Sequence, residues 1–281
     1  MTTAFVLSGG GSLGSVQVGM LMALAEQGIT PDLIVGTSVG ALNGGWIAAR
    51  SDPDGVAGLA DLWRSLSRAE VFPTGLRLGL LGFLGCRPNL VSDTGIRALL
   101  RRNLRFTELQ DAPIPLHVVA TDVLSGQDVL LSTGDAVDAI TASAAIPAVL
   151  PPVWIEGRAM MDGGVVNNTP ISHAVALGAT RIWVLSSGYA CAMRKPPRGA
   201  LAMALHALTL AINQRLASDV ERFEGVVDLQ VAPPLCPVPV SPIDFSRSDE
   251  LIDRALASTR DWLQTGLRGV GQAYLLRPHR D

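Results

Sequence analysis

The chain of 281 residues carries a formal net charge of −3 and a sequence pI near 5.8, and almost half of its residues are hydrophobic. Its lysines and arginines are scattered and form no basic stripe, so we expect no nucleic acid among its partners. The three cysteines, Cys86, Cys191 and Cys236, lie far apart and have the spacing of neither a disulfide framework nor a metal site.

The beginning of the chain lacks the basic segment and the long apolar stretch of a secretory signal peptide. The longest apolar candidate elsewhere, Ala200 to Ile212, contains a histidine and is shorter than the roughly 20 residues that cross a bilayer. We therefore expect a cytoplasmic protein in which this segment forms a buried helix.

Short apolar runs alternate with helical patterns along the chain, which predicts a central, mostly parallel sheet sandwiched by helices in a single domain over residues 1–281. The expected strands are 4–7, 32–35, a hairpin over 115–133, 152–157, 158–164, 181–187 and 226–231. The expected helices are 15–27, 39–49, 53–66, 94–103, 135–146, 170–178, 199–223 and 248–267, with an irregular stretch at 67–90 and a proline-rich connector at 233–242.

The stretch LSGGGSLG is a glycine-rich turn between the first expected strand and helix. Its Gly9, Gly11 and Gly14 match the G-x-G-x-x-G pattern of dinucleotide sites. Such a site also needs an acidic residue at the end of the second strand, where this chain has GTS at 36–38, while Asp32 precedes that strand. Bare amides before a helix suit any anion, including a tetrahedral oxyanion, although a turn that only permits tight packing is the alternative.

The stretch DLIVGTSVGALNGG places Ser38 in a G-x-S-x-G pattern, with Gly36 and Gly40 on either side, between a strand and a helix. This is the setting of a nucleophile elbow, in which a strained turn exposes the serine oxygen. An α/β-hydrolase has its nucleophile after several strands, whereas Ser38 follows the second, so that architecture is disfavoured. The alternative role of Ser38 is a helix cap.

A serine hydroxyl needs a base that takes its proton. The imidazole candidates are His117, His173, His206 and His279, of which His173 is the best placed, although its local sequence offers no acidic orienter. Asp162 in RAMMDGGVVNNTP ends an apolar run, so its carboxylate lies at a strand end, and Asp122 in VVATDV is a second strand-end carboxylate. An aspartate before glycine is commonly a turn residue, which is the alternative for Asp162.

These blocks together resemble the patatin-like phospholipase family in order and spacing. LSGGGSLGSVQVGMLMAL resembles its glycine-rich oxyanion loop, GTSVGALNG its nucleophile elbow and MDGGVVNNTP its D-G-G element, with TASAAIPAVLPPVWIEG as the apolar lead into the aspartate. The resemblance covers about residues 4–187, and the remaining part, with an expected helical extension over about 199–281, carries no assignable motif.

The resemblance implies a three-layer α/β/α fold and a Ser38–Asp162 dyad without histidine. It also implies an oxyanion hole lined by Gly9, Gly10 and Gly11, with the amides of Gly10 and Gly11 as the favoured donors. The implied activity is hydrolysis of a lipid or other acyl ester, with no cofactor or metal and with at most transient contact with a membrane surface.

Two further features bear on the substrate. Many relatives have arginine or lysine at the position of Leu13, so the resemblance supports an acyl-ester hydrolase better than a phospholipase that binds an anionic headgroup. The apolar stretch Gly75 to Gly85, flanked by Arg77 and Arg87, is a hypothetical lid or acyl-pocket wall, with an irregular core segment as the alternative. The competing functions are a dinucleotide-binding oxidoreductase and a catalytically silent interaction protein of the same fold.

Overall fold

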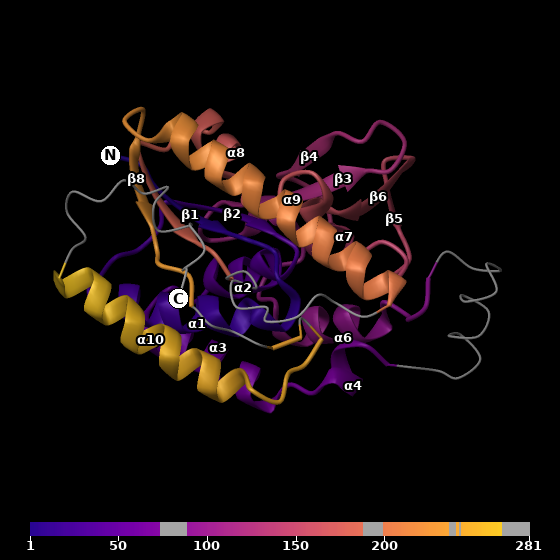
Figure 1. Cartoon of the computed structure of the whole chain (residues 1–281), viewed down its shortest axis with the longest axis horizontal. Helices are drawn as coiled ribbons and strands as arrows, with labels where there is room; N and C mark the ends of the chain where they lie inside the picture. The colour runs from indigo at the N-terminus through magenta and orange to yellow at the C-terminus, as the bar shows by residue number, and fades with distance from the viewer. Residues whose placement is uncertain (74–88, 188–198, 236–239, 242, 266–281) are drawn as a thin grey trace.

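A mixed sheet with helices on both faces forms the centre of the molecule in the computed structural model (Figure 1). The structure describes residues 1–73, 89–187, 199–235, 240–241 and 243–265. The strands are β1 (Thr3–Leu7), β2 (Leu33–Thr37), β3 (Leu116–Asp122), β4 (Asp128–Leu131), β5 (Val153–Ile155), β6 (Arg158–Asp162), β7 (Arg181–Leu185) and β8 (Asp228–Val231). The helices are α1 (Gly14–Glu26), α2 (Val39–Ile47), α3 (Pro53–Ser65), α4 (Arg68–Val71), α6 (Thr94–Asn103), α7 (Ala136–Ser143), α8 (Ile171–Ala176), α9 (Ala200–Phe223) and α10 (Ser248–Thr265).

The parallel part of the sheet has the order β8-β7-β1-β2-β3, and the other pairings are antiparallel: β4 and β6 both pair with β3, and β5 pairs with β6. Strands β1, β2 and β7 are almost entirely buried apolar runs, as expected for parallel strands that are covered on both faces. The β5–β6 hairpin closes through Glu156 and Gly157, which both have positive φ, the backbone of a two-residue hairpin turn.

Two separate hydrophobic cores lie on the two faces of the sheet. Helices α1, α2, α3, α6, α7 and α10 contribute to one core, and α8 and α9 contribute to the other. Figure 1 shows α9 and α10 on opposite sides of the sheet. The predicted three-layer α/β/α architecture is confirmed.

Helix α1 lies between the sheet and α10 and is buried on nearly all sides, which explains why its sequence is apolar around the whole helix. Gly19 allows the close approach of α10, because a Cβ there would lie 2.3 Å from the carbonyl oxygen of Ile252. The segment after residue 187 thus supplies β8 to the sheet and α10 to the core.

Most predicted elements are present within two residues of their expected bounds, and helix 94–103 matches α6. The prediction that 200–212 is a buried helix is wrong in part: it is helical, but Met203 and Leu210 expose 46% and 53% of their surface, because α9 covers the sheet with only one face. No helix in the described ranges is long and apolar enough to cross a membrane. The cysteines and the stretch Gly75 to Gly85 lie outside the described residues.

Strand β3 brings the ends of two other strands together. Thr37 of β2 lies opposite Val119, and Asp162 of β6 lies opposite the next residue, Ala120. Because β4 occupies the other edge of β3 over 118–121, β2 and β6 follow one another along the same edge and run in opposite directions. Their carboxyl ends therefore meet, and the residue after β2 is Ser38.

Candidate active site

Ser38 forms the apex of a tight turn between β2 and α2. Its backbone has φ 54° and ψ −123°, a conformation that residues with a side chain rarely adopt. The flanking glycines make the turn possible: a Cβ on Gly40 would lie 2.1 Å from the Leu7 carbonyl oxygen, and one on Gly36 would lie 2.6 Å from that of Gly40. Strain of this kind at a buried polar residue is typical of functional sites.

The Ser38 hydroxyl is hydrogen-bonded to the carboxylate of Asp162. Ser38 Oγ donates to Asp162 Oδ2 at 2.7 Å, and the amide of Gly164 donates to Asp162 Oδ1 at 2.7 Å. Both side chains are held in a buried environment, since Ser38 and Asp162 expose only 6% and 7% of their surface. The carboxylate is thus oriented by one backbone amide and directed at one hydroxyl.

Burial raises the pKa of Asp162 from its ordinary value of 3.8 to about 6, against the opposing effect of the hydrogen bonds from Ser38 and Gly164. A carboxylate in water is too weakly basic to take a proton from a hydroxyl effectively at neutral pH. A pKa of about 6 brings Asp162 closer to the range in which a side chain can both accept and return a proton near neutrality.

Ser143 of α7 holds the backbone of the turn at Ser38 by a hydrogen bond. The amide of Ser38 donates to Ser143 Oγ at 2.7 Å, and this hydroxyl donates in turn to the carbonyl of Val119 at 2.6 Å. The amide of the serine itself is therefore occupied by the protein. Sequence reasoning missed Ser143, because a serine inside a helix-like run of small residues carries no local signal of this contact.

The glycine loop passes directly beside Ser38, since a Cβ on Gly9 would lie 3.1 Å from the Cβ of Ser38. The amide of Gly9 is occupied, because it donates to the carbonyl of Asn168 at 3.1 Å. By contrast, the amides of Gly10 and Gly11 have no hydrogen-bond partner within the described part of the chain. Of the three glycines predicted to line an oxyanion hole, these two have amides free to meet an anion.

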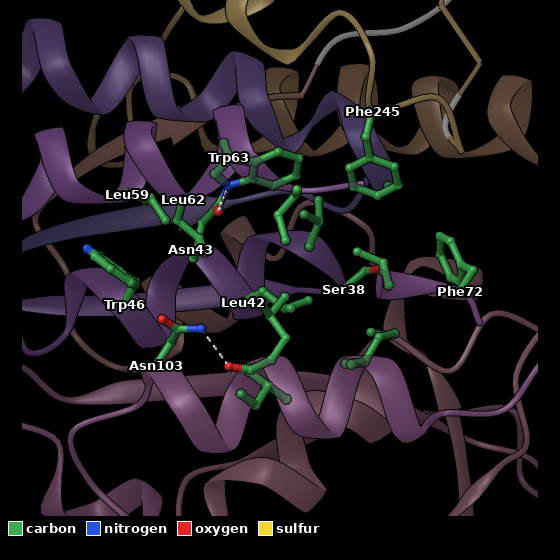
Figure 2. Close-up of a pocket in the computed structure, with 18 of the residues that line it drawn as sticks. Ser38, Leu42, Asn43, Trp46, Leu59, Leu62, Trp63, Phe72, Asn103 and Phe245 are labelled. Carbon is green, nitrogen blue, oxygen red and sulfur yellow. Dashed lines mark hydrogen bonds between the residues drawn. The ribbon is translucent and has the colours of Figure 1, made fainter. Parts of the chain in front are cut away.

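A series of hydrogen bonds between buried side chains supports the glycine loop. Trp63 Nε1 donates to Asn43 Oδ1 at 2.9 Å, Asn43 Nδ2 donates to Gln17 Oε1 at 2.9 Å, and Gln17 Nε2 donates to the carbonyl of Ser8 at 2.7 Å. Figure 2 shows the first of these bonds at the wall of the pocket. The series links the pocket wall to the first residue of the glycine loop, and sequence reasoning missed its three members.

Of the four candidate histidines, His173 and His117 have other hydrogen-bond partners, His206 lies on α9, and His279 lies outside the described residues. His173 Nε2 lies 2.9 Å from Asp128 Oδ2, so this histidine has an acidic neighbour that its local sequence did not reveal. His117 Nδ1 lies 2.7 Å from Ser132 Oγ. Among the described residues, no histidine is hydrogen-bonded to Ser38, and Asp162 is the acceptor of its hydroxyl.

Asp122 is a turn residue at the end of β3. Its Oδ1 accepts the amides of Leu124 and Ser125 at 2.9 and 3.0 Å, and its Oδ2 lies 3.8 Å from Arg158 Nη1. The turn role considered as the alternative for Asp162 is present at both residues, since Asp162 also accepts an amide of its own turn, from Gly164, but Asp162 in addition accepts the hydroxyl of Ser38.

Asp32 lies at the amino end of β2, where its Oδ2 accepts the amide of Thr3 at 2.7 Å. The glycine loop, in contrast, follows the carboxyl end of β1. Because β1 and β2 are parallel, the amino end of β2 and the carboxyl end of β1 lie at opposite ends of the strands. Asp32 is therefore not placed to hold a ribose at the glycine loop.

An apolar pocket extends away from Ser38 between α2, α3 and α6 (Figure 2). Leu42 lies between Ser38 and the far end, and Phe72 and Phe245 lie near the serine. Phe245, which comes from the segment just before α10, stacks on Trp63 with ring centroids 5.9 Å apart. The hydroxyl of Ser38 thus stands at one end of a space that suits a hydrocarbon chain.

The chain belongs to the patatin-like phospholipase family, because the sequence model of that family matches residues 5–175. It is 30% identical over 187 residues to patatin-like phospholipase domain-containing protein 7 of Rattus norvegicus, covering 66% of this chain and 13% of that protein. It is 26% identical over 196 residues to lysophospholipase NTE1 of Mycosarcoma maydis, covering 67% of this chain and 10% of that protein. The chain therefore spans only a small part of these relatives.

Among solved structures, VipD from Legionella pneumophila is similar, with a TM-score of 0.48 and 15% identity over 98% of this chain and 66% of that one.

Proposed function

We propose that this protein is a serine hydrolase of lipid acyl esters in which Ser38 is the nucleophile and Asp162 is the general base. The observation that carries the proposal is the 2.7 Å hydrogen bond from Ser38 Oγ to Asp162 Oδ2, in a buried site beside the amides of Gly10 and Gly11, for which the described residues supply no acceptor. Nucleophile, base and oxyanion donors are the three parts that acyl transfer needs.

In the acylation step, Ser38 Oγ attacks the carbonyl carbon of the ester while its proton passes to Asp162 Oδ2. The carbonyl oxygen becomes an oxyanion, which the amides of Gly10 and Gly11 stabilise by hydrogen bonds at the start of η1 (Gly11–Leu13). The tetrahedral intermediate collapses with cleavage of the C–O bond, and Asp162 returns the proton to the leaving alcohol.

In the deacylation step, a water molecule replaces the alcohol and gives its proton to Asp162 as it attacks the acyl carbon. Collapse of the second intermediate breaks the bond to Ser38 Oγ, which takes the proton back, and the fatty acid leaves. An ester suits a single carboxylate base better than an amide does, because an alkoxide departs with less assistance than an amine.

A lipid substrate is supported by the apolar pocket next to Ser38 and by membership of the patatin-like phospholipase family. Leu13, at the position where many relatives have arginine or lysine, offers no cation to an anionic headgroup, and it is buried at 8% exposure. We therefore propose that the acyl chain, which the pocket can enclose, contributes more to recognition than the headgroup.

The proposal is tested by reacting the protein with a fluorophosphonate and by assaying a chromogenic acyl ester, with Ser38→Ala as the test variant and His173→Asn as the control. We expect Ser38→Ala to lose covalent labelling and all hydrolysis above background, while His173→Asn stays within about threefold of the wild type, because His173 contacts Asp128 and not the serine. Labelling that persists in Ser38→Ala contradicts the assignment. Absence of labelling in the wild type, together with NAD binding in calorimetry, favours the dinucleotide alternative.

A further inference from the structure

Helix α2 begins directly after Ser38, and residues along one face of it form the floor of the pocket. Val39, Leu42, Asn43 and Trp46 line the pocket, and their spacing places them on one face of the helix. Trp46 is eight residues beyond Ser38, so at 1.5 Å per residue it lies about 12 Å from the serine along the helix axis. The helix therefore holds Trp46 at a fixed distance from the hydroxyl of Ser38.

The two walls of the pocket have nearly the same length as the floor. On the α3 side the lining residues run from Leu59 to Leu66, and on the α6 side they run from Ile96 to Asn103. Each stretch rises by about 10 Å, and both helices consist of three turns or so. Figure 2 shows Ser38 and Trp46 toward opposite ends, with Leu42 between them.

The indole of Trp46 is fixed at the far end by contacts outside the pocket. Its Nε1 donates to the carbonyl of Gly55 at 2.7 Å, and the guanidinium of Arg50 lies 4.1 Å from the ring centroid. A Cβ on Gly58 would already lie 3.3 Å from the indole, so α3 packs closely against it. Trp46 is thus a fixed wall and not a side chain that an entering group can easily displace.

The polar side chains of the pocket are engaged with the protein. Asn103 Nδ2 donates to the carbonyl of Leu99 at 2.8 Å, and Asn43 is hydrogen-bonded to Gln17, to the carbonyl of Gly14 and to Trp63. A chain that ends in a methyl group meets apolar surface along its length, whereas a polar terminus would lose its water without compensation.

On these grounds we propose that Trp46 sets the acyl-chain preference of the enzyme, so that its substrates are esters of acyl chains with about 8 to 10 carbons. This inference rests on the proposed ester hydrolysis. Each C–C bond of about 1.5 Å advances an extended chain by about 1.3 Å, so the helix rise of roughly 12 Å from Ser38 to Trp46 corresponds to about nine bonds. A longer chain must bend or leave its end in water.

The first test compares kcat/KM for monomeric p-nitrophenyl esters with acyl chains of 4 to 16 carbons. Burial of each additional methylene is expected to raise kcat/KM by about fourfold up to the limit set by Trp46, after which the rise ends. A value that still increases at the same rate up to 16 carbons overturns the inference, while hydrolysis itself leaves the proposed function in place.

Three variants move or preserve the limit. Trp46→Leu opens the far end, so the ratio of the 14-carbon to the 8-carbon ester is expected to rise about tenfold, with the 4-carbon ester changed less than about twofold. Leu42→Phe fills the floor one turn from Ser38 and is expected to shift the optimum down to 4 to 6 carbons. Trp154→Leu removes a tryptophan that is 69% exposed on β5, and it is the matched control that leaves the profile unchanged.

A binding series keeps the test independent of catalysis. In a Ser38→Ala protein, calorimetry with free fatty acids of 6 to 16 carbons is expected to give the same length limit and the same displacement by Trp46→Leu. If no ester is hydrolysed but fatty-acid binding still shows the length limit, the proposed function fails and the assignment of the pocket stands. Parallel profiles for the wild type and Trp46→Leu, in binding or in kinetics, overturn the assignment.

Discussion

Two aspartates end neighbouring strands of the same sheet, expose the same 7% of their surface, and yet have pKa values displaced in opposite directions. Asp162 ends β6, where burial raises its pKa to about 6. Asp122 ends β3, where the amides of Ser125 and Leu124, with Arg158 nearby, lower its pKa. Local sequence alone placed both residues at strand ends, and only the resemblance to a family distinguished Asp162 from Asp122.

The difference lies in what surrounds each carboxylate. Asp122 accepts two amides of its own turn and has a guanidinium nearby, so its charged form is favoured. Asp162 accepts one amide and one neutral hydroxyl in a buried site, so its charged form costs more than in water. The first arrangement favours the charged carboxylate, and the second raises the pKa of a carboxylate that we propose to be the base.

The largest expected contrast is in activity. Asp162→Asn removes the proton acceptor of Ser38 and is expected to lower kcat/KM for a chromogenic ester by about 10³-fold or more, whereas Asp122→Asn should stay within about threefold. Steady-state assays of both variants at pH 8 measure the difference. Equal losses in the two variants would mean that Asp162 has no special role.

The pH dependence of the wild type is the next largest effect. Because Asp162 must be ionised to accept a proton, kcat/KM is expected to fall about tenfold per pH unit below its pKa of about 6, or about 100-fold from pH 8 to pH 4. The profile should be flat between pH 7 and pH 8.5. A midpoint near pH 4 would show that burial does not raise this pKa, provided that circular dichroism shows the protein folded over the range.

As the pH rises through the pKa of Asp162, we expect activity to increase while the contribution of Asp162 to the free energy of unfolding decreases. A pKa raised from 3.8 to about 6 corresponds to about 3 kcal/mol that the wild type loses as the pH rises from 4 to 6. Asparagine has no charge to bury, so Asp162→Asn is expected to increase the free energy of unfolding by about 2 kcal/mol at pH 8 and by little at pH 4. Urea unfolding at both pH values tests this, and a destabilised variant at pH 8 would contradict it.

The smallest effect is expected at Asp122, with the opposite sign. Its lowered pKa contributes stability that is present at neutral pH and is lost as the pH falls through the pKa of the folded state. Asp122→Asn should therefore lower the urea midpoint at pH 7, and the difference from the wild type should shrink at pH 3. If the urea midpoint of the variant differed from that of the wild type by the same amount at both pH values, the effect would come from packing alone.

The sequence was sufficient for the layers of the fold and for placing Ser38 and Asp162 at strand ends, which the structure brings into hydrogen-bond contact. Apolar runs and helical periodicity indicate the elements directly, and glycines such as Gly36 and Gly40 mark the turn because no other residue fits there. The resemblance to a family then linked two segments that are distant in sequence.

The supporting contacts could not be predicted, because they join residues that are far apart in the chain and leave no local pattern. Ser143 reaches the amide of Ser38, Asp128 reaches His173, and Phe245 stacks on Trp63. Helix α9 shows the converse, since an apolar run suggested burial while the packing left Met203 and Leu210 exposed.

Strands β2 and β6 share one edge of β3, so we expect the site to be sensitive to insertions and deletions within β6. Substitutions do not reveal this sensitivity. Side chains alternate between the two faces of a strand, so deleting one residue within β6 would turn the carboxylate at its end away from Ser38. Length changes at Glu156 and Gly157, in the hairpin tip, leave the pairing of β6 with β3 intact. Related chains should therefore vary freely in length at this tip and hardly at all along the strand.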